Sequence, residues 1–348
     1  MGAAYTKPKE VESVAFPAFK ESPDAPSLKD KNIAITGCTS GTGLVAAKFV
    51  AEKGAKTVFL LNRPSERAEK ALAAVNEVAP RGTRVVHVDC DLMSFDSVRA
   101  AAVKVLPDAI KSGGLDVLAN NAGVMALADK ATKDGYDVQM QTNHLSHFLL
   151  SKELYPALKL AATTRGEARI VNHSSGARFM PGTKLTTANC EKYLGKNGGD
   201  LGGDGSSMIL GGARWVRYAY TKLSNAVFTL VLSEKLEGTG IKALCATPGL
   251  AATNLQVTTA SDGAFGMMDN WIMRMAQSGE DGAVPLLYCC VAPGVENGDL
   301  IEPEHNGKLM PRMYGGAKKW EWGSEASTTA DKEAFWAASE AAAGKWDF

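Results

Sequence analysis

The sequence predicts an α/β fold, a doubly wound parallel sheet with helices on both faces. Short apolar runs alternate along the chain with longer amphipathic stretches, and the runs are apolar at nearly every position, as in strands buried on both faces. A glycine cluster, "TGCTSGTG", stands between the first apolar run and the first amphipathic stretch. The chain has 348 residues, enough to bury a substantial core in a single domain of this kind.

The expected elements follow this alternation. Strands are predicted at the apolar runs 32–36, 57–61, 84–88, 115–119, 168–173 and 242–247. Helices are predicted over 42–53, 65–79, 94–111, 134–161 and 214–236, and over the Ala- and Glu-rich stretch 324–344. Residues 1–30 contain prolines and no clear period, so we expect an N-terminal arm before one domain over 31–348. Residues 176–213, rich in Gly, Ser and Thr, predict a long loop insertion before the helix at 214–236.

Composition excludes several classes of function. Lys plus Arg and Asp plus Glu each total 38, which disfavours a strongly basic nucleic-acid binder. The six cysteines have no metal-ligand spacing, so we expect reduced thiols and no metal site. No apolar run reaches the roughly 18 residues of a membrane span, and the N-terminus lacks the apolar segment of a signal peptide. We therefore expect an intracellular protein, cytoplasmic or organellar, that is soluble or weakly membrane-associated.

The glycine cluster predicts a dinucleotide-binding turn. Glycines between a strand and a helix allow a tight turn and let the backbone approach a pyrophosphate at the helix N-terminus. A glycine cluster alone also fits an ordinary βα turn, but here it opens the first βα unit of a Rossmann-like pattern. The residues expected to line the turn are Gly37, Thr39, Ser40, Gly41, Thr42 and Gly43.

The end of the second strand, "FLLNRPSER", bears on the choice of cofactor. A site for NAD would place a carboxylate there, about 20 residues past the glycines, to bind the ribose 2′-hydroxyl. Asn62 and Arg63 occupy that place instead. A guanidinium binds a 2′-phosphate well, so NADP(H) is the expected cofactor. The alternative is that Arg63 is a solvated residue at the start of a helix.

The stretch "RYAYTKLSN", residues 217–225, offers two tyrosines ahead of one lysine. Residues four apart on a helix share a face, whereas residues two apart point in nearly opposite directions. Tyr218 therefore pairs with Lys222, and Tyr220 faces away. A cation near a phenol lowers its pKa from about 10, as a general acid/base requires. Tyr218 is the expected catalytic tyrosine.

Together these motifs are similar to those of the short-chain dehydrogenase/reductase family. The glycine spacing TGxxxGxG, "NNAG" at 120–123, "NHSSGAR" and YxxxK spread the resemblance over about residues 31–255. It implies a Rossmann-like NADP(H)-dependent oxidoreductase in which the Ser175 hydroxyl holds the substrate oxygen beside Tyr218, while Ser174 faces the other way. It also implies a structural and proton-relay role for Asn143.

The same resemblance implies the remaining cofactor contacts. Those expected for the adenine ring, the ribose and the nicotinamide carboxamide are Asp91, Leu92, Asn120, Asn121, Ala122, Gly123, Pro248, Gly249 and Thr253, with Tyr218 and Lys222 also beside the cofactor. His144 and His147 stand at i and i+3 and suggest a metal pair, but no third ligand is nearby, so we interpret them as polar groups of the helix.

The substrate is less determined than the reaction type. The long insertion and the phrases "NNAGVMA" and "TNHLSHF" resemble retinol-dehydrogenase-like and carbonyl-reductase-like members of the family. The insertion also carries apolar residues that suit a flap closing over a bulky, lipophilic carbonyl or alcohol. They are Phe179, Met180, Leu185, Tyr193, Met208, Ile209 and Leu210. The alternative interpretation is that these side chains pack the insertion onto the sheet.

Two other functions stay open. "GGDLGGDGSSMILGG" and the tail "SEASTTADKEAFWAASEAAAG" resemble light-dependent protochlorophyllide oxidoreductase, which reduces a C=C bond. That enzyme carries a cysteine after the Pro-Gly of its nicotinamide loop, where this chain has Leu250. The third hypothesis is an NADP-binding sensor or scaffold without turnover, for which a broken Ser/Tyr/Lys set is expected. Family members often pair through the helices predicted at 134–161 and 214–236, so the resemblance also allows a homo-oligomer.

Overall fold

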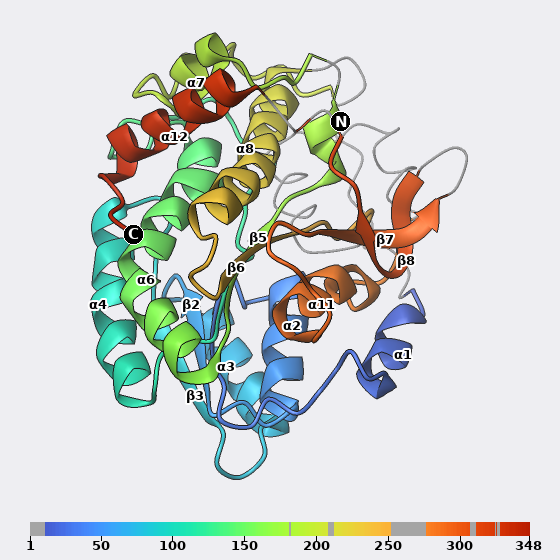
Figure 1. The fold of residues 1–348 in the computed structure, drawn as a ribbon. Helices are drawn as coiled ribbons and strands as arrows, with labels where there is room; N and C mark the ends of the chain where they lie inside the picture. The colour runs from blue at the N-terminus through green and yellow to red at the C-terminus, as the bar shows by residue number, and fades with distance from the viewer. Residues whose placement is uncertain are drawn as a thin grey trace.

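The structure is a computed structural model that describes residues 11–180, 182–207, 212–251, 276–306, 311–323, 325 and 328–348. In this part of the chain, eight strands form one sheet in the order β3-β2-β1-β4-β5-β6-β7-β8 (Figure 1). The chain enters at β1 and the strand order reverses between β1 and β4. In open α/β sheets, ligands bind at the carboxyl ends of the strands on either side of such a reversal.

The six predicted strands are confirmed, and two further strands extend the sheet. The strands are β1 Asn32–Thr36, β2 Thr57–Asn62, β3 Arg84–Asp89, β4 Val117–Asn120, β5 Ala168–His173, β6 Ile241–Ala246, β7 Leu300–Asn306 and β8 Pro311–Trp320. Strands β1 to β7 pair in parallel, and β8 pairs antiparallel with β7 at the edge. The sequence pattern misses β7 and β8 because "LIEPEHN" mixes charges with Pro303 and "PRMYGGAKKW" contains two glycines.

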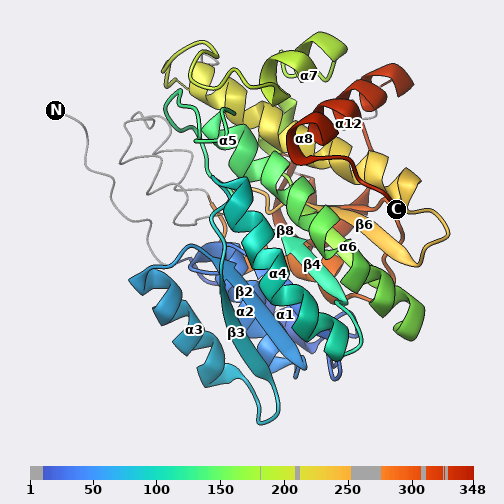
Figure 2. The ribbon, with the colours of Figure 1, turned by 90° about the vertical axis from the view of Figure 1, so that its left-hand side faces the viewer.

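Helices cover both faces of the sheet, as predicted. Their bounds are α1 Ala15–Glu21, α2 Gly41–Glu52, α3 Glu66–Val78, α4 Phe95–Lys111, α5 Val138–Met140, α6 Ser146–Arg165, α7 Thr187–Leu194, α8 Ala213–Lys235, α11 Val284–Val291 and α12 Thr329–Ala343, with a π-helical turn η1 at Gln141–Leu145 and 3₁₀ turns η2 at Gly176–Phe179 and η3 at Asp281–Ala283. Helices α4, α6, α8 and α12 bury one core cluster (Figure 2), and α1, α2, α3 and α11 bury the other.

The described part of the predicted N-terminal arm is docked on the fold. Phe19 of α1 packs against Phe49 of α2 and Tyr288 of α11. The carboxylate of Asp281 accepts hydrogen bonds from the hydroxyl of Ser13 at 2.7 Å and from the backbone N–H groups just before and within α1. The segment 11–30 therefore belongs to the packed α/β unit.

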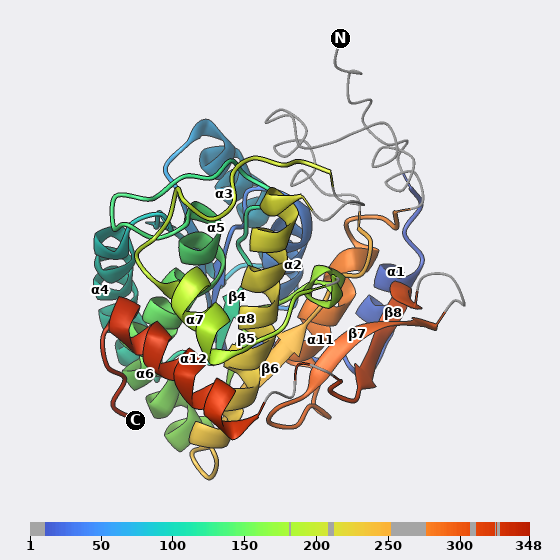
Figure 3. The ribbon, with the colours of Figure 1, turned by 90° about the horizontal axis from the view of Figure 1, so that it is seen from above.

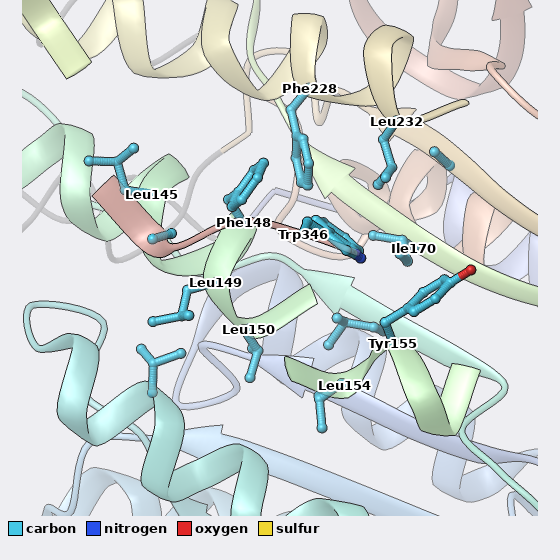
Figure 4. Packing of buried hydrophobic residues seen from close by; sticks show 14 of the residues in the cluster. Leu145, Phe148, Leu149, Leu150, Leu154, Tyr155, Ile170, Phe228, Leu232 and Trp346 are labelled. Carbon is cyan, nitrogen blue, oxygen red and sulfur yellow. The ribbon is translucent and has the colours of Figure 1, made fainter. Parts of the chain in front are cut away.

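The C-terminal helix begins at Thr329, later than predicted, with Thr328 as its N-cap. It lies across α6 and α8 (Figure 3). Beneath it, Phe148 of α6 and Phe228 of α8 contact Trp336 and Trp346 in one aromatic cluster. Figure 4 shows Phe148, Phe228 and Trp346 side by side. The homo-oligomer that the resemblance allows would pair through α6 and α8. The face of these two helices that lies beneath α12 is covered by the chain itself.

Candidate active site

The predicted catalytic pair lies on α8, with its tyrosine and lysine one helical turn apart. Lys222 Nζ lies over the Tyr218 ring, 5.8 Å from its centroid, and both side chains are buried. The ammonium donates to the carbonyl oxygen of His173, the last residue of β5, at 3.0 Å. This bond ties the catalytic turn of α8 to the carboxyl end of the sheet.

Burial dominates the ionisation of this pair. It raises the pKa of Tyr218 to about 12, although a hydrogen bond with Ser175 acts in the opposite direction. Burial also lowers the pKa of Lys222 to about 8. The phenol pKa is therefore raised in the chain itself and not lowered as expected, because burial disfavours the phenolate. Tyr218 is held as a neutral phenol, the form that donates a proton.

The two serines after β5 face different ways, as predicted. Ser174 is buried and donates its hydroxyl to the carbonyl oxygen of Lys222 at 2.7 Å, so it fastens α8 to β5. Ser175 is half-buried, accepts from the backbone N–H of Ala177 at 3.2 Å, and reaches the phenol of Tyr218. Ser175 is thus the serine that shares a site with the tyrosine.

Asn143 lies in the π-helical turn η1, fully buried beside the catalytic turn of α8. Its amide exchanges two hydrogen bonds of 2.8 Å with the backbone of Val124 and donates to the Thr221 hydroxyl at 2.9 Å. A Cβ on Gly123 would lie 3.3 Å from Asn143 Oδ1 and 3.4 Å from Lys222 Nζ. Single π turns inside helices often occur at functional sites, and this one brings Asn143 next to Lys222.

The neighbouring histidines have separate partners. His144 Nε2 bonds the hydroxyl of Ser339 in α12 at 3.0 Å, and His147 Nε2 bonds the hydroxyl of Thr36 in β1 at 2.9 Å. Burial lowers the pKa of His144 to about 3 and that of His147 to about 4. Both imidazoles are neutral polar groups that join the helix to its surroundings.

The glycine turn and the "NNAG" segment form one hydrogen-bonded unit. Asn121 donates to the carbonyl oxygen of Thr36 at 2.9 Å and accepts from the hydroxyl of Thr42 at 2.9 Å, and the Thr36 hydroxyl accepts from the N–H of Ala122. A Cβ on Gly43 would come within 2.3 Å of the Gly37 carbonyl oxygen, so α2 approaches β1 too closely for any side chain there.

This turn fits a dinucleotide phosphate. Gly37 and Gly41 have φ of 73° and 56°, which glycine adopts without strain. Ser40 is the N-cap of α2 but makes no side-chain capping bond, whereas Ser65 and Ser94 cap α3 and α4. The first N–H groups of α2 are therefore left uncapped by Ser40, and uncapped helix N-termini bind anions. Thr39, Ser40 and Gly41 are only half-buried, so the turn is accessible.

The sequence interpretation missed a basic residue that contacts the turn. Arg67 on the first turn of α3 donates to the Ser40 hydroxyl at 3.1 Å. Arg63, the predicted reader of a 2′-phosphate, is exposed just after β2. Asn62 is buried and accepts from the backbone N–H of Cys38, so its side chain shapes the glycine turn. A basic residue at the start of α3, one turn past Arg63, was the available signal in the sequence.

Two of the expected cofactor residues have buried side chains, and a third makes a local hydrogen bond. Asn120 donates to Ser151 and Asn172 at 2.9 Å in the core, and the Leu92 side chain is buried in the core that α4 and α6 cover. The Asp91 carboxylate accepts from the N–H of Met93 in its own turn. Asn120 and Leu92 thus have only their backbone groups to offer a cofactor.

The loop expected to meet the nicotinamide packs against β8. Gly249 has φ of 66°, and a Cβ there would come within 2.4 Å of the Met313 carbonyl oxygen. That same oxygen accepts from the N–H of Leu250 at 3.0 Å, and the Pro248 carbonyl oxygen accepts from the side chain of Gln277. Thr253 lies outside the described residues.

Apolar side chains surround the phenol of Tyr218. Met125, Ala126 and Trp215 form a buried cluster with it, and Ala177 and Met180 pack against that cluster from the Ser175 side. The sequence interpretation missed Met125, although it directly follows "NNAGV".

The described residues of the insertion, 176–180, 182–207 and 212–213, include regular structure, which bears on part of the flap hypothesis. They contain η2 and α7, and Leu185 and Tyr193 are buried in the main core. The Tyr193 ring stacks on Tyr220 with centroids 3.9 Å apart. Leu185 and Tyr193 therefore pack the insertion onto the fold, while Phe179 and Met180 lie at the site end. Met208, Ile209 and Leu210 are outside the described residues.

Comparison with known proteins shows the family. The family model described as short chain dehydrogenase matches residues 31–190. A short-chain dehydrogenase/reductase of Armillaria gallica is 31% identical over 307 residues, which cover 86% of this chain and 91% of that protein. The chain belongs to the short-chain dehydrogenase/reductase family.

Two further relatives are similar to this family member over a shorter span. An uncharacterized oxidoreductase of Schizosaccharomyces pombe is 33% identical over 234 residues, and the match covers 67% of this chain and 63% of that protein. Human retinol dehydrogenase 12 is 29% identical over 269 residues, covering 77% of this chain and 76% of that protein.

Solved structures support the same fold. An uncharacterized protein of Mycobacterium paratuberculosis superposes with a TM-score of 0.66 at 27% identity, covering 93% of this chain and 97% of that one. A 3-ketoacyl-(acyl-carrier-protein) reductase of Brucella melitensis, complexed with NADH, gives a TM-score of 0.57 at 23% identity, covering 79% and 96%. Among the helices that the structure describes, none is long and apolar enough to cross a membrane.

Proposed function

We propose that the protein is an NADP(H)-dependent oxidoreductase that interconverts the carbonyl and alcohol of a lipophilic substrate. The observation that carries the proposal is the convergence of Ser175, Tyr218 and Lys222 at the carboxyl end of β5, with Met125 and Trp215 against the phenol. Apolar walls of this kind favour a substrate that is itself poor in polar groups.

The cofactor proposal rests on the glycine turn and on two arginines. The N-terminus of α2, which Ser40 does not cap, suits a pyrophosphate. Arg67 beside Ser40 and the exposed Arg63 would supply guanidinium groups for a 2′-phosphate. Backbone atoms of 120–123 would line the ribose, while Pro248 and Gly249 would meet the nicotinamide. Bound NADPH would supply the hydride that reduces the carbonyl carbon.

The chain's own groups would handle the substrate oxygen. The Ser175 hydroxyl would donate to the carbonyl oxygen, and Tyr218 would pass its phenolic proton to the same oxygen as negative charge develops there. A phenol whose pKa is raised by burial is protonated near neutral pH, and this is the form that can donate to a carbonyl oxygen. The buried ammonium of Lys222 would then stabilise the phenolate that remains.

The experiment is a turnover screen with NADPH, run in the dark and under illumination. All-trans-retinal, decanal and a steroid ketone serve as bulky apolar carbonyls, acetaldehyde as a small one, and a quinone and protochlorophyllide complete the panel. We expect dark reduction of the bulky carbonyls with the lowest KM. Trp215→Ala should raise KM for those substrates and leave that for acetaldehyde nearly unchanged.

Two outcomes would redirect the proposal. Light-dependent reduction of protochlorophyllide alone would assign the protein to C=C reduction. Binding of NADPH with no turnover of any substrate would favour a cofactor-binding sensor or scaffold.

A further inference from the structure

A fully buried arginine lies directly behind the candidate catalytic serine. Arg178, in the 3₁₀ turn that Ser175 caps, donates through Nη1 to the Ser175 carbonyl oxygen at 3.1 Å and to the Thr247 hydroxyl at 3.2 Å. Thr247 immediately precedes Pro248 and Gly249. One guanidinium edge therefore spans the serine loop and the expected nicotinamide loop.

The rest of the guanidinium is held by two buried carboxylates. Arg178 Nε donates to Glu325 at 2.5 Å, and Nη2 lies 2.9 Å from Glu302 in β7. Glu302 is paired again, with Arg312 of β8 at 2.7 Å. The two arginines and two glutamates balance in charge, and the Phe179 ring covers the guanidinium with its centroid 4.1 Å from Arg178 Cζ.

This cluster joins the site to the β7–β8 hairpin by a second route as well. Met313, next to Arg312, accepts from the N–H of Leu250 and lies against Gly249. The side chain of Met313 would lie 3.6 Å from a Cβ on Gly176, the residue after Ser175. The hairpin thus touches both loops on which Arg178 holds a hydrogen bond.

We propose that Arg178 is a positioning residue that fixes the Ser175 loop relative to the 247–250 loop by anchoring both on the β7–β8 hairpin. Its role in the reaction rests on the proposed function, whereas the anchoring itself does not. Burying a guanidinium is costly unless its charge is paired, and the two carboxylates supply that pairing. A fixed fork of donors is also required, because a lysine ammonium cannot reach Ser175, Thr247 and both glutamates together.

The test compares Arg178→Lys with Thr247→Val and with a matched control, Arg169→Lys. Arg169 is also buried and ion-paired, through Glu167, but it stands at the opposite end of β5, where it donates to the Cys289 carbonyl oxygen. Hydrogen–deuterium exchange is measured over 174–180 and 247–250 in the full chain, with NADPH affinity by fluorescence and kcat with the substrates of the screen above.

Arg178→Lys should accelerate exchange in both segments, weaken NADPH, and lower kcat by roughly 10- to 100-fold, the usual cost of displacing reacting groups by about 1 Å. Thr247→Val should accelerate exchange over 247–250 and weaken NADPH while leaving 174–180 protected. Arg169→Lys should leave exchange over 174–180 and over 247–250 unchanged.

Equal rates of hydrogen–deuterium exchange over 174–180 and 247–250 in the Arg178→Lys and Arg169→Lys proteins would overturn the proposal. If Arg178→Lys does not fold, the Thr247→Val protein provides the test. Unchanged exchange over 247–250 together with unchanged NADPH affinity in Thr247→Val would then overturn the proposal. Exchange and cofactor binding require no turnover, so a wrong substrate class would leave this result intact.

Discussion

Lys222 lies over the ring of Tyr218, with its ammonium nitrogen 5.8 Å from the ring centroid. Both side chains are buried on consecutive turns of α8, and the ammonium is fixed by its hydrogen bond to the carbonyl oxygen of His173. Burial raises the pKa of the phenol and lowers that of the ammonium. This arrangement supports the proposed role of the pair, in which a protonated tyrosine donates to a substrate oxygen and the lysine cation stabilises the phenolate.

The two tyrosines of α8 should differ in their effect on turnover. Tyr218→Phe is expected to abolish reduction and leave NADPH binding largely intact, because only the proton donor is lost. Tyr220 instead accepts from Asn189 at 2.8 Å and donates to the Gly182 carbonyl oxygen at 3.2 Å, which holds the insertion. Tyr220→Phe should keep most of the activity. Steady-state rates of the two variants check this prediction. Equal losses of activity in both variants would contradict it.

Cofactor choice should depend on the basic residues at the start of α3. A charge-assisted hydrogen bond to phosphate contributes roughly 1.5–3 kcal/mol, or about 10- to 100-fold in affinity. Arg63→Ala and Arg67→Ala are each expected to weaken NADPH and barely change NADH, with the larger effect at Arg67 because it already contacts Ser40.

Arg84→Ala is the control for cofactor choice, since Arg84 begins β3 and pairs with Asp108 on the surface. Calorimetric affinities for both cofactors provide the measurement. An equal loss of affinity for NADPH and NADH would mean that the arginines support the loop and do not bind the 2′-phosphate.

The pH dependence of cofactor capture should report Lys222. Its pKa is lowered from 10.5 to about 8 by burial, so the free protein loses this ammonium as pH rises through about 8. We expect kcat/KM for NADPH to fall above that pH, because this parameter reports ionisations of the free enzyme. In Lys222→Arg, whose cation does not titrate there, any residual activity should lack the break. A break near pH 8 that persists in Lys222→Arg would assign it to another group.

Asp137 should make folding stability depend on pH. Burial raises its pKa from 3.8 to about 6, with Arg217 nearby acting in the opposite direction. The folded state then holds this proton more tightly than the unfolded chain, so the stability from this group is complete below pH 3.8 and is lost as pH rises through about 6.

Asp137→Asn removes that titration while keeping an oxygen that can cap α5. The unfolding free energy of the wild type relative to Asp137→Asn should therefore decrease by up to about 3 kcal/mol from pH 4 to pH 7. Denaturant unfolding at both pH values measures the difference. A difference that is constant or grows with pH is incompatible with a buried proton on Asp137.

The sequence was most informative where strands are buried on both faces. β1, β2 and β5 appear as near-continuous apolar runs, and the structure places them within a residue of the prediction. β7 gives no such signal because Glu302 stands inside it, and its charge is compensated by the distant Arg178 together with Arg312 of β8. A pairing between residues so far apart in sequence cannot be predicted from a local pattern.

The site was predictable in outline and less so in electrostatics. The spacing of Tyr218 and Lys222 fixes their shared face, but the phenol is also packed against Met125, which comes from a distant segment. Alternation along β4 also explains why Asn121 joins the glycine turn while Asn120 points into the core. Motif position alone does not distinguish these two neighbours.

The measurement that most directly tests carbonyl reduction at Tyr218 is transfer of deuterium from NADPH labelled at nicotinamide C4. The product of all-trans-retinal or decanal is analysed by mass spectrometry for wild type, Tyr218→Phe and Tyr220→Phe. We predict an alcohol with one deuterium on the former carbonyl carbon for wild type and Tyr220→Phe, and none for Tyr218→Phe. Undiminished transfer by Tyr218→Phe, or no transfer to any carbonyl of the panel by a wild type that binds NADPH, would contradict the account.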